Sequence, residues 1–206
     1  MSLCYKKIQK KPNLLVSTLI VIAVILSPSC VNVGGYSSVE EFKCTNPGVK
    51  MQEVPGTPGI LISPTQCYDY TFISSKVSQA LIIFVEEYSN AFNTPHGDVW
   101  RALSGLKIEV SVYGRQVSSA FDVNGKLIYN AHVNGLALSK KHIWVEIKTK
   151  QINTTAFIHE LAHIMIWNIQ GVHGDPDHEG HEYSGWTRTH TTLIENVNIR
   201  LLESGI

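Results

Sequence analysis

The sequence predicts an α+β domain in which a small mixed or antiparallel sheet packs against helices. Two observations support this class: three stretches carry apolar residues at helical spacing, and several short stretches between them alternate apolar and polar residues. The chain has 206 residues, 44% of them hydrophobic and 17% charged, which is enough for one domain with a core.

The first expected helix covers residues 74–92. Val77, Leu81 and Val85 recur at the spacing of one helical face, and Ser74 or Ser75 is a suitable N-cap.

Three alternating segments follow, and each is typical of β-strands. They cover residues 107–113, residues 126–138 and residues 142–148. The middle segment is interrupted at Asn134-Gly135, so it contains one or two strands.

Two helices complete the expected domain, which we place at residues 70–206. Residues 155–170 form an apolar helix, with a cap available from Asn153, Thr154 or Thr155. The last helix covers residues 188–203, and His190 is expected at the surface near its start.

The N-terminal segment is typical of a bacterial secretory signal peptide over residues 1–29. Residues 1–13 contain four lysines and no acid, and residues 14–26 are apolar except for Ser17 and Thr18. An uncleaved anchor is the alternative, but a stable membrane span needs about 20 apolar residues.

Cys30 follows the leader directly, and the Ser29-Cys30 step resembles a lipoprotein signal, although Leu26 lies one position further from the cysteine than usual. We expect an exported protein that a lipid on Cys30 anchors to a membrane of the cell envelope. Ordinary cleavage after Ser29 is the alternative. Residues 30–69 are expected to be an irregular tether, with a Cys44–Cys67 disulfide because lipidation of Cys30 leaves an even pair.

The charge balance argues against a nucleic-acid partner. The chain has 17 basic and 17 acidic residues, so it has no basic excess that could neutralise a phosphate backbone.

The segment His159-Glu160-Leu161-Ala162-His163 is an HExxH motif within the expected helix at 155–170. Residues four apart project from the same helical face, which suits two imidazole ligands of one zinc ion. Glu160 then lies beside the metal, where it can accept and return a proton as a general base.

A catalytic zinc site needs a third protein ligand and an open position. The candidates are His178, His181 and Glu195, and we favour His178 because Asp177 could orient its imidazole. Tyr183 is a candidate donor to an oxyanion, or else a buried tyrosine. The metzincin pattern is excluded because it requires Gly and His where this chain has Ile166 and Ile169.

On these residues the chain resembles zincin-type metallopeptidases over residues 70–206. The HExxH motif, Trp167 and a downstream histidine in a loop containing Gly and Asp are loosely similar to SprT-like members. The resemblance implies zinc on His159 and His163, Glu160 as general base, and an edge strand at residues 142–148 that holds an extended peptide.

The sequence therefore predicts a zinc-dependent hydrolase, specifically a metallopeptidase that uses zinc-bound water to cleave a peptide or protein. The alternative is a non-catalytic zinc-binding or structural lipoprotein of the envelope. Glu160 distinguishes the two, because a storage site does not need a base beside its ligands.

Overall fold

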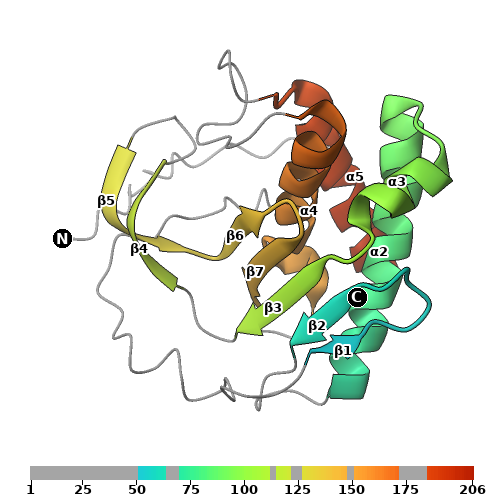
Figure 1. Ribbon diagram of the computed structural model, residues 1–206, viewed down its shortest axis with the longest axis horizontal. Helices are drawn as coiled ribbons and strands as arrows, with labels where there is room; N and C mark the ends of the chain where they lie inside the picture. Colours follow the sequence, from blue (N-terminus) through green and yellow to red (C-terminus); the bar gives the residue numbers. More distant parts are fainter. Residues whose placement is uncertain (1–50, 64–69, 112–114, 122–126, 148–150, 172–184) are drawn as a thin grey trace, which may run out of the picture.

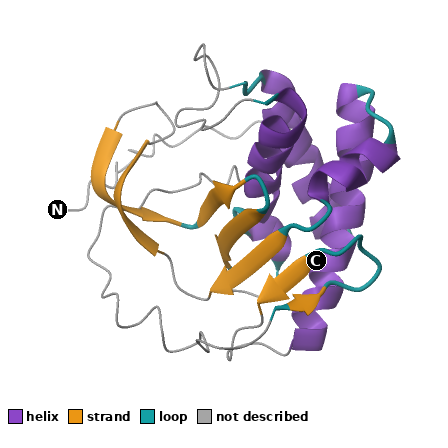
Figure 2. Cartoon of the chain, viewed as in Figure 1, coloured by secondary structure: helices purple, strands orange, loops and turns teal. Residues whose placement is uncertain are grey.

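The computed structural model describes residues 51–63, 70–111, 115–121, 127–147, 151–171 and 185–206. The predicted signal peptide, Cys30 and the Cys44–Cys67 pair lie outside these residues. Within the described part, the helices gather on one side of a mixed sheet (Figures 1 and 2). The predicted α+β class with a mixed sheet is confirmed.

The main sheet has five strands in the order β1-β2-β3-β7-β6. Strands β2, β3 and β7 run parallel to one another, whereas β1 and β6 run antiparallel to their neighbours and form the two edges. The bounds are Gln52–Glu53 for β1, Leu61–Ser63 for β2, Lys107–Ser111 for β3, His142–Glu146 for β7 and Gly135–Ser139 for β6.

A second sheet consists of β4 (Arg115–Phe121) and β5 (Leu127–Val133), which pair antiparallel. It lies apart from the main sheet, on the side away from the helices (Figure 1). The predicted break at Asn134-Gly135 is confirmed, because β5 ends and β6 begins there. Strand β4 was not expected.

The expectation that residues 30–69 are irregular is wrong for part of that range. Strands β1 and β2 join the main sheet, and the Val54 N–H donates to the Ile60 carbonyl at 2.8 Å across the turn between them. Val54, Ile60 and Ile62 are fully buried, so long-range burial overrides the local turn signals of this Pro- and Gly-rich segment.

The helices are α2 (Tyr70–Phe92), α3 (His96–Leu103), α4 (Phe157–Met165) and α5 (Arg188–Glu203), with a 3₁₀ turn η1 (Ile152–Thr154) and a π-helical turn η2 (Ile166–Gln170). One or two helices were expected besides the HExxH helix, and α3 is the one that the sequence did not reveal. It is short, and only Val99 and Leu103 are buried in it.

Helix α2 begins earlier than predicted, so Ser74 and Ser75 do not cap it. Their hydroxyl groups instead donate to the carbonyls of Thr71 and Phe72, within the helix. Helix α5 has the predicted bounds. The helix expected over residues 155–170 starts at Phe157 as an α-helix and continues as the π-helical turn, which ends at Gly171 with a left-handed φ of 73°.

Helix α4 lies in the middle of the packing, in contact with β6, β7, α3 and α5. Alternate residues of the parallel strands face the helices, namely Ile108 and Val110 of β3 and Ile143 and Val145 of β7. These side chains and the inner faces of α2, α4 and α5 form one core, which holds the HExxH helix against the sheet.

None of the helices in the described ranges is long and apolar enough to cross a membrane.

Candidate metal centre

Helix α4 is a core helix that carries three polar residues, His159, Glu160 and His163. Its other side chains are all buried: Phe157, Ile158, Leu161, Ala162, Ile164 and Met165. The Thr155 hydroxyl, one of the three predicted caps, accepts the Phe157 N–H at 3.2 Å. The apolar surroundings therefore fix the rotation of the helix and with it the direction of His159, Glu160 and His163.

The two histidines of the motif converge as predicted. Their Nε2 atoms lie 3.0 Å apart, and their ring centroids lie 4.7 Å apart at an interplanar angle of 73°. Two nitrogens bound tetrahedrally at the usual zinc distance lie about 3.3 Å apart. The pair therefore fits two positions of one zinc ion after a movement of a few tenths of an ångström.

Trp186 covers this histidine pair. Its ring centroid lies 5.0 Å from the centroids of both His159 and His163, and its side chain is buried. The Trp186 Nε1–H donates to the Thr191 hydroxyl of α5 at 3.1 Å, which fixes the indole. Trp186 therefore forms one wall of the site and contacts both imidazoles.

The His190 ring lies between the rings of Trp186 and Phe92 of α2. Its centroid is 5.5 Å from that of Trp186 and 4.5 Å from that of Phe92. It is fully buried rather than at the surface, so that expectation is wrong. Its Nδ1 accepts the Thr187 N–H at 3.1 Å as part of the capping box of α5, so the proton of the neutral ring is on Nε2. Burial lowers the pKa of His190 to about 4.

Glu160 points toward the sheet. It is 5% exposed, and burial raises the pKa of its carboxyl to about 8, although a hydrogen bond from the Ala137 backbone lowers it in part. The carboxyl therefore carries its proton at neutral pH in this state. A positive charge at the histidine pair would lower the pKa and favour the ionised form that a general base requires.

The strand beside Glu160 is β6. The sequence led us to expect that residues 142–148 form the edge strand, which is wrong: β7 lies between β3 and β6, and β6 is the edge strand among the described residues. The error arose because β7 has the stronger strand pattern, whereas the order of strands depends on contacts far apart in the chain. Gly135 and Ala137 are thus site residues that sequence reasoning missed, although the Asn134-Gly135 break marked the position.

Of the other predicted site residues, only Glu195 lies within the described part of the chain. His178, His181 and Tyr183 lie outside the described residues. Among the described residues, no group of three or more His, Cys, Asp or Glu side chains is arranged to hold a metal, so Glu195 does not join His159 and His163. The described geometry therefore supplies two ligands.

Residues 172–184, which contain His178, His181 and Tyr183, connect η2 to the segment that carries Trp186, and they lie outside the described residues. A comparison with protein-family models, with curated proteins and with solved structures finds no match to this chain. Functional inference therefore depends on the geometry of the site.

Proposed function

We propose that this chain is a zinc-dependent hydrolase that cleaves a peptide or protein substrate. The observation that carries the proposal is the convergence of the His159 and His163 Nε2 atoms, 3.0 Å apart, on one face of a buried helix. The Glu160 carboxyl beside them is buried, which is costly for stability unless a nearby positive charge compensates it. A zinc-type site explains all three residues together.

Each residue has a distinct role in this proposal. His159 and His163 bind the metal through Nε2, and the metal supplies a Lewis acid that polarises a carbonyl and lowers the pKa of water to about 7. Glu160 takes a proton from the attacking water and returns it to the leaving amine. Its burial supports this role, because a base that is screened from bulk solvent keeps the proton within the site.

The free edge of β6 is the proposed substrate platform. Glu146 N donates to the Asn134 carbonyl at 2.8 Å, so Asn134 faces β7 and the alternating pattern turns the backbone groups of Gly135 and Ala137 toward the free edge. An extended peptide could pair with the backbone groups of Gly135 and with the Ala137 carbonyl, because the Ala137 N–H already donates to Glu160. This would place a scissile bond beside Glu160.

We keep His178 as the proposed third ligand and Tyr183 as the proposed oxyanion donor. The neighbouring Asp177, which could orient the imidazole, supports His178 over His181. His178→Ala and His181→Ala decide between the two histidines. Loss of the ligand should abolish stoichiometric zinc binding, whereas loss of a residue that only orients a ligand should cost about 10–100-fold in affinity.

The alternative is a zinc-binding or structural envelope lipoprotein without catalysis, and the buried neutral state of Glu160 is the observation in its favour. The test is Glu160→Gln, with Glu109→Gln as the matched control on the other face of the sheet. We expect both variants to bind one zinc and only Glu160→Gln to lose hydrolysis of a model peptide. Equal turnover by both variants would exclude Glu160 as the base.

We also propose export and membrane association through a lipid on Cys30. Mass spectrometry of the N-terminal peptide tests this proposal, and Cys30→Ser should release the protein from the membrane fraction. A mature protein that starts at an unmodified Cys30 would contradict lipidation and leave export intact.

A further inference from the structure

Gly135, the first residue of β6, differs from most other described glycines. Six described glycines have a positive φ, a backbone conformation that other residues adopt only with strain. They are Gly56, Gly59, Gly105, Gly171, Gly185 and Gly205. Gly135 is not among them. Its backbone conformation is therefore open to any residue, and another reason must account for the missing side chain.

That reason is space at the HExxH glutamate. A Cβ atom on Gly135 would collide with Oε1 of Glu160, and it would lie 2.8 Å from Glu160 Cγ and 2.7 Å from Ala156 Cβ. Real Cβ atoms essentially never come this close to another heavy atom. A Cβ on Gly97 would have no neighbour within 4 Å, so that glycine provides an unconstrained comparison.

The two neighbours that a Cβ atom on Gly135 would meet, Ala156 and Glu160, differ in how far they can move. Ala156 is the N-cap residue of α4, so its Cβ moves only with the start of the helix. Glu160 is the flexible neighbour, and a side chain at position 135 would push its carboxyl away from β6. This would break the hydrogen bond from Ala137, two residues further along the same strand.

We propose that Gly135 is a positioning residue for Glu160, and this inference rests on the proposed hydrolase function. Gly135 leaves the volume that the carboxyl occupies, and the Ala137 N–H holds the carboxyl there. Strand β6 thereby sets the position of the base as well as offering a free edge for the substrate. Gly135 has no side chain of its own, so it acts only through Glu160.

The first test measures kcat, KM and zinc content for Gly135→Ala and for Gly97→Ala as the control. Gly135→Ala should keep one zinc and a KM within about twofold, and lose at least tenfold in kcat, because the ligands are intact and the base is displaced. Gly97→Ala should match the wild type. An unchanged kcat in Gly135→Ala would overturn the proposal.

A second set of variants separates positioning from simple packing. The shorter acid in Glu160→Asp removes the contact with Oε1 but keeps Cγ, so Gly135→Ala should lower kcat by a smaller factor in that background than in the wild type. Ala156→Gly relieves only the packing contact, so it should restore part of the thermal stability of Gly135→Ala without restoring kcat. If adding Ala156→Gly fully restored kcat to Gly135→Ala, Gly135 would matter only for packing against Ala156, and the proposal would be wrong.

The inference can also be tested if the wild type hydrolyses no peptide, an outcome that would refute the proposed function alone. In metal-free protein, Gly135→Ala should lower Tm by about 3–8 °C. The decrease should fall to half or less in the Glu160→Ala background, where the carboxyl is absent. Equal decreases in both backgrounds would show that Glu160 does not occupy this volume, and the proposal would be wrong.

Discussion

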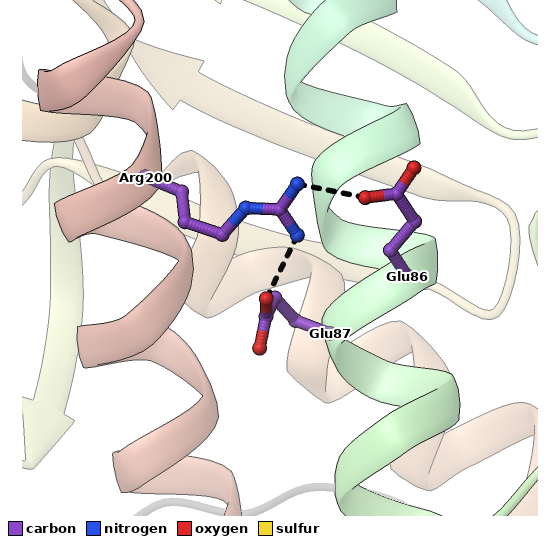
Figure 3. A network of polar contacts seen from close by, with 3 residues as sticks. All are labelled: Glu86, Glu87 and Arg200. Atoms are coloured by element: carbon purple, nitrogen blue, oxygen red, sulfur yellow. Dashed lines mark hydrogen bonds and ion pairs between the residues drawn. The ribbon is translucent and has the colours of Figure 1, made fainter.

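Two sets of carboxyl groups in this molecule are held in opposite ways. Between α2 and α5, Arg200 donates to Glu86 at 2.7 Å and to Glu87 at 2.8 Å (Figure 3). These hydrogen bonds raise the pKa of Arg200. The side chains are partly solvated, with 38%, 41% and 19% of their surfaces exposed for Arg200, Glu86 and Glu87, so water screens the attraction.

Glu160 lies between α4 and β6, where burial leaves it 5% exposed, and the contact described for its carboxyl is a backbone hydrogen bond from Ala137. The α2–α5 carboxyls therefore face a positive charge, whereas burial opposes ionisation of the carboxyl at the α4–β6 contact. A buried acid without a compensating charge destabilises a fold, and such acids concentrate at functional sites. The comparison supports a structural role for the first set and a chemical role for Glu160.

The largest expected effect concerns the pH dependence contributed by Glu160. Its pKa rises from 4.5 in the unfolded chain to about 8 in the fold, so its contribution to stability is lost as pH rises through this window. In metal-free protein, Glu160→Gln should remove this loss, on the order of 3 kcal/mol at pH 9. Urea unfolding of both proteins at pH 5, 7 and 9 measures the difference, and a constant difference across that range would contradict the burial of an uncompensated acid.

The next effect concerns zinc, which in the proposed function would provide a positive charge beside Glu160. Zinc at 100 times its dissociation constant should stabilise the wild type by about 2.7 kcal/mol. His163→Ala should lose this stabilisation, and Arg200→Gln should keep it. Thermal unfolding with zinc and with a chelator provides the measurement. If zinc stabilised His163→Ala as much as the wild type, the histidine pair would not be the zinc site.

His190 should show the opposite pH dependence. Its pKa falls from 6.5 to about 4 on folding, so the stability that it contributes above pH 6.5 is lost as pH falls toward 4. His190→Gln keeps a capping side chain at this helix position but cannot titrate. The wild type should lose about 1–2 kcal/mol relative to this variant between pH 7 and pH 4. A parallel pH dependence of the two proteins would show that His190 is not buried in its neutral form.

The smallest effect is expected at the exposed ion pairs. Arg200→Gln should lower the free energy of unfolding by about 0.5–1 kcal/mol at low salt, and the loss should shrink in 1 M NaCl because salt screens exposed charges. Chemical unfolding at two salt concentrations tests this expectation. If Arg200→Gln lowered the free energy of unfolding by more than the changes at Glu160 and His190, independently of salt, the ion pairs would contribute more to stability than the buried groups.

Local pattern accounts for most of the helices. The spacing of Val77, Leu81 and Val85 predicted α2, and α5 has the predicted bounds, because one apolar stripe on a helix is a property of neighbouring turns. The short helix α3 and the strands β1 and β2 were missed, because their few buried residues acquire meaning only through contacts with distant segments.

The sequence by itself determined the histidine pair and the α+β class. Four residues along a helix place two imidazoles on one face whatever surrounds them, and the observed 3.0 Å between Nε2 atoms follows from that spacing. The tertiary structure alone decided that β6 is the edge strand, that Gly135 and Ala137 enclose the Glu160 carboxyl, and that Trp186 covers the imidazoles. Strand order and side-chain burial depend on packing between segments far apart in the chain, and no local pattern encodes that packing.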